Sequence, residues 1–451
     1  MNRSEAQFKK MTETPIPRLV ISLGIPTVIS MLVTNIYNMA DTFFVGQLDN
    51  TSASAAVGVV FGYMAVIQAI GFMFGQGAGS IISRMLGAKE EKEASKVAST
   101  AFFLALSVGA TLGITSMILR KPLLHLLGSS DTIYPFAKDY IKFIMAAAPI
   151  TMGSFVLNNI LRYEGKASLA MIGLCTGSII NIGLDPIFMF VLDMGIAGAG
   201  FATALSQCIS FSLLLFMFLR GKTQCKLKVR EIYLRLSLIL DIVTTGFPAF
   251  IRQGLTSIST MVLNRIAGGY GDPAIAAMSI VNRLAFFMFA VGLGLGQGYQ
   301  PVCGFNYGAK KYDRVKEAFR FTLVVNEIVL GCFAVVGFFI APEAVSWFRN
   351  DPEVIKIGKV ALRFACGALF LQPLTVMSNM TFQSTGQKLL ASFTAMLRSG
   401  LYFIPIIAIS ESLVGLRGIQ FAQPLADVLS FATVVPLIIY FFRNIDKEKT
   451  S

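Results

Sequence analysis

Two aspartates, Asp41 and Asp185, interrupt otherwise apolar stretches in the first half of the chain. A carboxylate within the hydrocarbon of a membrane is costly, so each one calls for a function and a partner. Asn181 lies four residues before Asp185, and therefore one turn away on the same helix face. Thr203 follows in the next apolar stretch. Pro186 has no amide hydrogen, which leaves the carbonyl four residues before it without its usual donor.

These groups share one chemistry, because carboxylate, amide, hydroxyl and carbonyl oxygens are the ligands that a small hard cation prefers. The helices expected in this half carry no Lys or Arg at the depth of the two acids. The two carboxylates would repel each other, so at least one should hold a proton readily. We therefore predict a cation-coupling site, for a proton or a sodium ion, at Asp41, Asn181, Asp185 and Thr203.

Neither a further metal site nor a cofactor is expected. The six cysteines have no CxxC or paired spacing and are interpreted as small apolar fillers. His125 is the sole histidine, and one histidine cannot build a metal site by itself. The coupling ion is thus the only bound ion predicted.

The elements that position these residues are membrane spans. Hydrophobic residues make up 55% of the chain and charged ones 14%, outside the usage of soluble domains. About twelve apolar stretches are each roughly long enough to cross a hydrocarbon core. The expected spans are 17–45, 54–83, 97–118, 139–161, 168–192, 197–219, 238–265, 275–303, 320–341, 361–384, 390–410 and 417–442.

Basic residues alternate between the connections, which argues against nucleic acid as the reason for the net charge of +13. By the positive-inside rule the basic connections and both termini are cytoplasmic, and the helix number is even. The basic segments are the amino terminus, 84–96, 220–235, 310–320 and the carboxyl tail.

An internal repeat relates the two halves of the chain. Its matched blocks are Gly24-Ile25-Pro26 with Gly246-Phe247-Pro248, Gly75-Gln76-Gly77 with Gly296-Gln297-Gly298, Gly87-Ala88-Lys89 with Gly308-Ala309-Lys310, and Gly195, Gly198, Phe201 and Ala202 with Gly415, Gly418, Phe421 and Ala422. Six helices in each half make this a parallel repeat, related by an axis along the membrane normal.

The predicted fold is an all-α integral membrane protein with twelve transmembrane helices in two pseudo-symmetric six-helix bundles. Its expected parts are a cytoplasmic amino terminus 1–16, an N-lobe 17–219, a cytoplasmic linker 220–237, a C-lobe 238–442 and a cytoplasmic tail 443–451. Rocking of one bundle against the other offers alternating access. Pro26 and Pro248 are either bending points or static kinks in the first helix of each half.

Counting about 1.5 Å per residue from the expected helix ends places Asp41, Asp185 and Thr203 at one level in the outer half of the membrane. The second half mixes signs instead. Ion pairing is the preferred interpretation of its charged residues, Arg252, Arg283, Arg398, Glu327 and Asp427; contact between one of the acids and a cationic substrate is the alternative.

The chain resembles the multidrug and toxic compound extrusion (MATE) transporters, and in particular their DinF-type prokaryotic branch. The likeness covers essentially the whole chain. It rests on Pro26, Asn38-Met39-Ala40-Asp41-Thr42 with Gly46, Gly75-Gln76-Gly77, Arg162-Tyr163-Glu164-Gly165, Asn181-Ile182-Gly183-Leu184-Asp185-Pro186 and the block from Gly195 to Ala202.

The resemblance implies a V-shaped pair of lobes that exports amphipathic organic cations against a cation gradient. It places the cation site at the four residues named above and a conformational switch at Glu164, for which pairing with Arg162 or Lys166 is the plainer alternative. Tyr37 and Asn158 resemble positions that line the amino-lobe cavity and contact substrate. We expect a monomer in the inner or plasma membrane of a prokaryote, with no nucleic acid partner.

Two other functions stay open. A lipid-linked oligosaccharide flippase of the same superfamily would share the two lobes but needs a strongly basic cavity. A membrane-embedded enzyme would need a nucleophile with a base, a histidine pair or a metal cluster, and the sequence has no such pattern. We therefore expect a transporter and not an enzyme.

Overall fold

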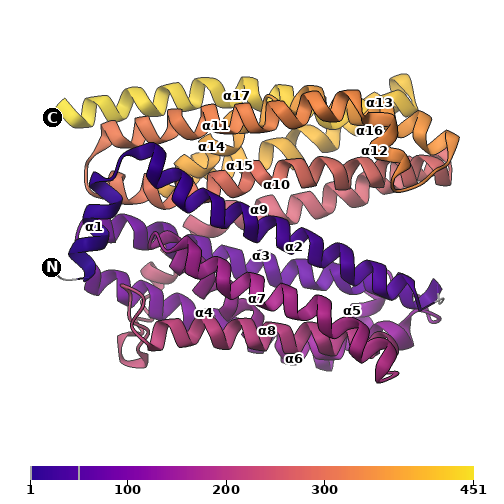
Figure 1. Ribbon diagram of the computed structural model, residues 1–451, viewed down its shortest axis with the longest axis horizontal. Helices are drawn as coiled ribbons and strands as arrows, with labels where there is room; N and C mark the ends of the chain where they lie inside the picture. The colour runs from indigo at the N-terminus through magenta and orange to yellow at the C-terminus, as the bar shows by residue number, and fades with distance from the viewer. Residues whose placement is uncertain (1–2, 49–50, 451) are drawn as a thin grey trace. The chain divides into compact units, whose positions relative to one another are not determined.

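The computed structural model describes residues 3–48 and 51–450, which form helices and connections without β-strands (Figure 1). Ten helices of this part are long and apolar enough to cross a membrane. Helix α9 (Leu236–Ala267) and the pair α13 (Pro352–Leu369) and α14 (Gln372–Ser384) stand where the other two spans were expected, which gives twelve. The predicted fold class is confirmed.

The remaining elements follow the chain in order. They are α1 (Arg3–Glu13), α2 (Ile16–Gly46), α3 (Thr51–Gly87), α4 (Glu91–Ile118), α5 (Arg120–Leu126), α6 (Tyr134–Tyr163), α7 (Ala167–Pro186), η1 (Ile187–Val191), α8 (Gly195–Leu219), η2 (Val229–Glu231), η3 (Gly268–Tyr270), α10 (Asp272–Gly308), α11 (Tyr312–Phe339), α12 (Ala341–Ser346), α15 (Lys388–Met396), η4 (Leu397–Tyr402), α16 (Phe403–Val414) and α17 (Leu416–Thr450).

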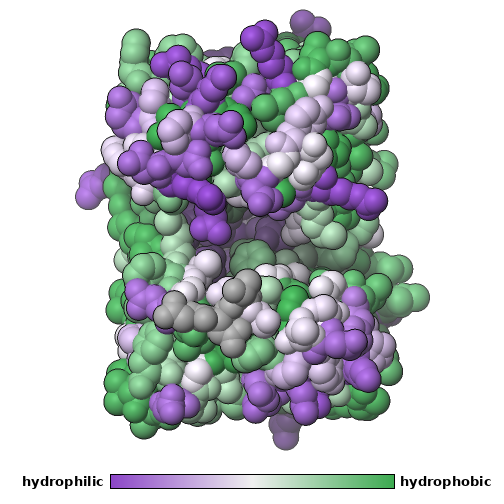
Figure 2. All heavy atoms as spheres, turned by 90° about the vertical axis from the view of Figure 1, so that its right-hand side faces the viewer, coloured by the Kyte–Doolittle hydropathy of each residue, from purple (hydrophilic) through white to green (hydrophobic). Residues whose placement is uncertain are grey.

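One expected span differs from the structure. The stretch 361–384 is not one helix, because α13 ends at Leu369 and α14 begins at Gln372. Pro373 explains the break, since proline restricts the residue before it and favours the first turn of a new helix. Glu353 lies in the first turn of α13. Figure 2 shows hydrophilic side chains gathered in the upper part of the face that it draws.

The chain divides into two compact units. The N-unit comprises Met1–Lys9 and Ile29–Phe250, and the C-unit comprises Lys10–Val28 and Ile251–Ser451. One boundary falls within α1, between Lys9 and Lys10, and the other two fall within α2 and α9, two residues after Pro26 and Pro248 respectively. Each of these helices therefore contributes one part to each unit, whereas the lobes expected from the sequence took each helix whole.

Glycines permit the closest helix crossings within each unit. In the N-unit, a Cβ on Gly77 of α3 would collide with the carbonyl of Ile242 and with Gly246 of α9. In the C-unit, a Cβ on Gly298 of α10 would collide with Gly24 of α2. The repeat-related blocks thus pair crosswise, because the second helix of each half packs on the early part of the other half's first helix.

The repeat also appears in the backbone. Lys89 and Lys310 both adopt positive φ, of 65° and 57°, where α3 and α10 end. Gly165 and Gly386, at the ends of α6 and α14, have φ of 77° and 83°. Left-handed backbone is uncommon for a residue with a side chain, so its recurrence at matched lysines shows that the two halves share local structure as well as sequence.

Candidate functional site

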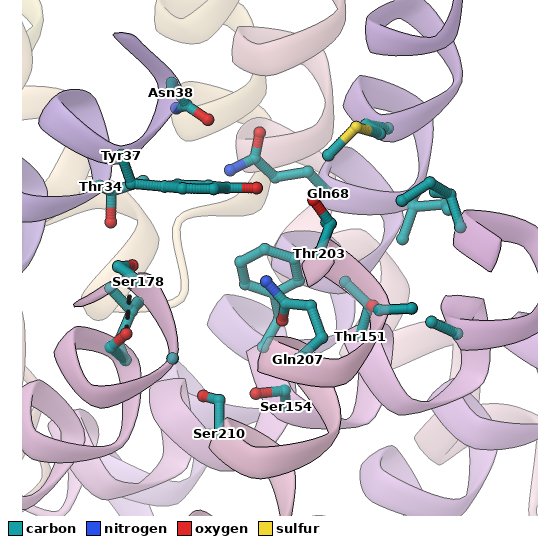
Figure 3. Close-up of a pocket in the computed structure, with 18 of the residues that line it drawn as sticks. Thr34, Tyr37, Asn38, Gln68, Thr151, Ser154, Ser178, Thr203, Gln207 and Ser210 are labelled. Carbon is teal, nitrogen blue, oxygen red and sulfur yellow. Dashed lines mark hydrogen bonds between the residues drawn. The ribbon is translucent and has the colours of Figure 1, made fainter. Parts of the chain in front are cut away.

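A cavity of about 120 Å³ lies within the N-unit, among α2, α3, α6, α7 and α8 (Figure 3). Its walls mix aromatic and aliphatic side chains with hydroxyl and amide groups. None of the residues that line it carries a charge. The polar lining residues are Thr34, Tyr37, Asn38, Gln68, Thr151, Ser154, Asn158, Ser178, Thr203, Gln207 and Ser210.

Small residues on α3 set the cavity wall by bringing this helix close to α6. A Cβ on Gly71 would lie 2.9 Å from the ring of Phe155, and one on Gly75 would lie 2.8 Å from the amide of Asn159. The Tyr37 ring extends from α2 across the cavity, with its hydroxyl toward Gln68 (Figure 3). Tight packing behind the cavity thus fixes the helices that carry its polar groups.

The structure places Tyr37 and Asn158, the two predicted substrate contacts, in the cavity lining. The Asn158 amide nitrogen donates to the carbonyl of Ala170 at 2.8 Å and joins α6 to α7. Its oxygen and its second amide hydrogen are the groups that can bind a ligand. Gln68 and Gln207 also line the cavity and were not predicted, although an amide in an apolar span is itself a sequence signal.

The four predicted cation-coupling residues are all buried in the N-unit. Asp185 is 0% exposed and Asp41 is 8% exposed. The two acids are close enough to interact electrostatically. Tyr140 of α6, which was not predicted, donates a long hydrogen bond of 3.4 Å to Oδ2 of Asp41. Within the described residues, Oδ1 of Asp41 is buried without a hydrogen-bond partner.

Asn181 joins the second acid to the next helix. With its amide nitrogen facing Asp185, it donates to Oδ2 of that acid at 3.0 Å, and its oxygen accepts from the backbone nitrogen of Thr203 at 3.1 Å. This orientation satisfies both ends of the amide. In the opposite orientation the nitrogen donates to the Thr203 hydroxyl at 3.3 Å, and the oxygen faces only acceptors. Immediately after Pro186, the backbone passes into the π-helix η1, a local widening that often marks functional sites.

Thr203 and Tyr37 connect the buried acids to the cavity. Both residues line the cavity. The hydroxyl groups of Tyr37 and Tyr140 each interact with the Thr203 side chain and lie within electrostatic range of Asp41. Tyr37 and Thr203 thus lie between the two carboxylates and the cavity, and neither acid lines the cavity.

Glu164 follows the last residue of α6 and is fully buried. Its carboxylate accepts hydrogen bonds from the backbone nitrogens of Gln224 and Cys225, at 2.9 and 2.8 Å, in the connection between α8 and α9. Lys166 completes the site with an ion pair at 3.4 Å. The pairing with Lys166 considered from the sequence is present, and Glu164 additionally anchors the linker.

Among the described residues, the charged groups of the C-unit are accommodated partly by ion pairing and partly by amide side chains. Arg398 pairs with Asp427 at 2.7 Å. Arg252 donates to the amide oxygen of Asn379 at 3.1 Å, and Arg283 is exposed. Glu327 on α11 is half-buried. Amide side chains, and not only opposite charges, thus accommodate the polar groups of this unit.

Comparison with known proteins agrees with this architecture. The chain is 27% identical to the multidrug export protein MepA of Staphylococcus saprophyticus over 94% of both chains. It is 28% identical to MepA of Staphylococcus haemolyticus over 98% of this chain and 97% of that protein.

Solved structures share the fold. One described as a crystal structure of MATE in complex with MaL6 matches with a TM-score of 0.92 and 25% identity, over 99% of this chain and 100% of that one. The outward-facing conformation of a multidrug resistance MATE family transporter of the MOP superfamily also matches with a TM-score of 0.92. The MatE family model matches residues 26–187 and again 248–409. The resemblance noted from the sequence motifs is confirmed, and the chain belongs to the MatE family.

Proposed function

We propose that this protein is a secondary active multidrug exporter that moves amphipathic organic cations in exchange for protons or sodium. One observation carries the proposal: an uncharged cavity of about 120 Å³ shares Tyr37 and Thr203 with a buried pair of carboxylates. A mainly apolar pocket with scattered polar groups suits varied amphipathic ligands. The MepA relatives are named multidrug export proteins.

Coupling follows from the shared residues. Binding of an ion at Asp41 or Asp185 removes negative charge beside Tyr37 and Thr203, which changes both the field in the cavity and the hydrogen bonds of its wall. An ion that prefers one conformation shifts the equilibrium by its difference in affinity. Bound substrate must then change the affinity for the ion by the same factor. Binding of the drug and binding of the ion would then weaken each other, although the two ligands do not touch.

Protons are the better-supported coupling ion. A sodium ion would need oxygen ligands, and the carboxylates and the Thr203 hydroxyl fit that need. In the amide orientation that satisfies both of its ends, however, the oxygen of Asn181 accepts from the backbone nitrogen of Thr203 and its nitrogen faces Asp185. A nitrogen donor repels a metal ion but holds a carboxylate that takes up a proton on its other oxygen. Sodium remains the alternative, with Asn181 turned over.

Alternating access would bend α2 and α9. Each helix is packed into one unit before its proline and into the other unit after it. A change in the orientation of the units would therefore be absorbed partly near Pro26 and Pro248, and partly within α1, where the chain also passes from one unit to the other. A proline removes one backbone hydrogen bond and makes this bend less costly. Pro26 is accordingly proposed as a bending point.

Glu164 is proposed to switch the linker between anchored and released states. In the Glu164→Gln variant, the ion pair with Lys166 is lost and the two backbone hydrogen bonds weaken. Burial and the nearby Glu164 carboxylate raise the pKa of the Cys225 thiol above its usual range, so this thiol should be unreactive in the anchored state. With Cys225 as the single cysteine, we expect about tenfold faster alkylation in this variant, because lost charge-assisted hydrogen bonds are worth about 1.5–3 kcal/mol.

Glu93→Gln is the matched control for that measurement, because Glu93 is half-exposed and pairs with Lys96 on the surface. Equal alkylation rates in the wild type and in the Glu164→Gln variant would exclude a switch at this residue.

The basic connections are proposed to face the cytoplasm, with both termini on that side of a prokaryotic cell membrane. Lys89, Lys310 and Lys228 are exposed and suit single-cysteine labelling in a cysteine-free background. We expect an impermeant maleimide to label all three positions only after the cells are opened. Labelling of any of them in intact cells would overturn the topology.

Drug efflux from proteoliposomes tests the function. Proteoliposomes that contain the purified protein would be loaded with ethidium. A proton gradient and a sodium gradient would then be imposed separately. We expect the proton gradient alone to drive accumulation against the ethidium gradient, with no requirement for sodium. Absence of transport under both gradients would refute the proposal. The flippase alternative is disfavoured, because no lining residue of the cavity is basic and could bind a phosphate.

A further inference from the structure

The repeat assigns to each residue that lines the N-unit cavity a counterpart in the C-unit. Asn158 and Asn379 are 221 residues apart and make the same bond: each amide nitrogen donates to a carbonyl twelve residues later, Ala170 at 2.8 Å and Ala391 at 2.7 Å. The matched glycines Gly195 and Gly415 both have positive φ, of 54° and 63°. These landmarks relate each cavity-lining position of the N-unit to a position in the C-unit.

Four of the cavity positions correspond to C-unit residues that form one cluster. Gln68, Thr151 and Gln207 become Phe289, Gln372 and Asp427. Gly177 becomes Arg398, to within one residue because the π-helix η4 begins at Leu397.

The four C-unit residues contact one another. Nε of Arg398 donates to Oδ1 of Asp427 at 2.7 Å, and the guanidinium lies 4.6 Å from the centroid of the Phe289 ring. Gln372 donates to Oδ2 of Asp427 at 2.9 Å. An arginine and its partners thus occupy the place that is hollow in the N-unit.

Asp427 is saturated by its neighbours, whereas Arg398 is not. The carboxylate is buried and accepts a third hydrogen bond, at 3.1 Å, from Gln423. Arg398 uses only Nε, and its side chain is 26% exposed. Within the described part of the chain, its two terminal nitrogens have no protein hydrogen-bond partner. The terminal nitrogens of a guanidinium can donate two parallel hydrogen bonds to the oxygens of one anionic group, such as a carboxylate or phosphate.

Two further observations point to a ligand. Oε1 of Gln372 is buried and has no hydrogen-bond partner among the described residues, which leaves a polar atom for a donor group or for water. Arg252 donates a hydrogen bond to Asn379 of α14. Asn379 follows Gln372 by seven residues and therefore lies on the same face of this helix. Two arginines and one aspartate leave a net positive charge on this face, opposite in sign to the acids of the N-unit.

We propose that the cluster of Phe289, Gln372, Arg398 and Asp427 is a second binding site that accepts an anionic group, a carboxylate, sulfonate or phosphate. The terminal nitrogens of Arg398 hold the anion, Asp427 holds the arginine in place, and Phe289 covers one face of the guanidinium. The site goes beyond the proposed export of cations, and it would receive either the acidic group of a small organic molecule or the headgroup of an anionic lipid.

Equilibrium binding tests the site without any ion gradient, so its failure is distinct from failure of the export function. The probe is the fluorescent anion dansylate, with uncharged dansylamide as its isostere, added to protein in phosphatidylcholine nanodiscs. We expect saturable binding of dansylate that weakens tenfold or more in Arg398→Gln/Asp427→Asn. This double variant removes both charges and avoids an unpaired Asp427. Binding of dansylamide should be unchanged.

Matched variants decide between charge, geometry and location. Arg398→Lys keeps the charge but loses the fork and should bind with intermediate affinity. Arg283→Gln removes an exposed arginine and should leave binding unchanged, as should Gln207→Ala in the N-unit cavity. Equal dansylate affinity in the wild type and the double variant would overturn the site, and so would a loss of affinity confined to Gln207→Ala.

Adding phosphatidylglycerol to the nanodiscs separates the two sources of the anion. Competition with dansylate that disappears in the double variant identifies a lipid headgroup as the natural occupant. If phosphatidylglycerol leaves dansylate binding undiminished, the occupant of the site is a soluble organic anion. Either result supports the anionic site and states what fills it.

Discussion

Asp41→Asn and Asp185→Asn are each expected to reduce gradient-driven drug efflux by about tenfold or more, within the range typical of coupling between two sites. Asparagine keeps the size of the side chain but cannot exchange a proton. Both acids are buried beside the residues that connect them to the cavity, so the loss should affect coupling more than folding. Efflux should be measured together with the amount of protein in the membrane.

The exposed Asp139 provides the matched control. It pairs with Lys142 on the surface of α6, and Asp139→Asn should transport normally. Fluorescent cation binding adds a second readout: in the wild type we expect affinity to fall as the pH is lowered, and in Asp41→Asn/Asp185→Asn to be independent of pH. Normal efflux by both single variants would remove the coupling site from the N-unit.

Gly246→Ala is expected to destabilise the protein although alanine favours helices. A Cβ at this position would collide with the carbonyl of Met73 in α3, so one of the two backbones has to move. Overpacking of this kind costs about 1–3 kcal/mol. The thermal unfolding midpoint in detergent should therefore fall by several degrees, and transport should fall with it because this crossing supports one end of α9.

Gly254→Ala, on the same helix, is the control with the opposite sign. No atom lies within 4 Å of its added Cβ. Here alanine should stabilise the helix by about 0.5–1 kcal/mol, through the smaller entropy that it loses on folding. If both variants shift the midpoint in the same direction, the crossing of α3 and α9 is not tightly packed.

The sequence determined the membrane class, the number of spans and the repeat. These features are local, because each span must satisfy its backbone within itself and must be apolar along its length. Polar residues inside such spans are conspicuous for the same reason. Asp41, Asp185, Asn181 and Thr203 were therefore recognisable, and the structure places all four among the buried polar residues of the N-unit.

Only the tertiary structure decided which groups meet. Periodicity could not show that Tyr140 would donate to Asp41, that the Asn181 amide would lie between Asp185 and Thr203, or that Glu164 would anchor the linker. These contacts join helices far apart in the sequence, and their geometry depends on packing and not on spacing along one helix.

The exchange of helix parts was also hidden from the sequence. The repeat assigned Gly24 and Gly246 to separate halves, but each packs against the second helix of the other half. The sequence offered Arg398 and Asp427 as candidates for an ion pair, but it gave no sign that Gln372 and Phe289 would join them. A hydropathy pattern records how far a segment lies from water, whereas the choice of neighbour follows from side-chain volume and hydrogen bonding in three dimensions.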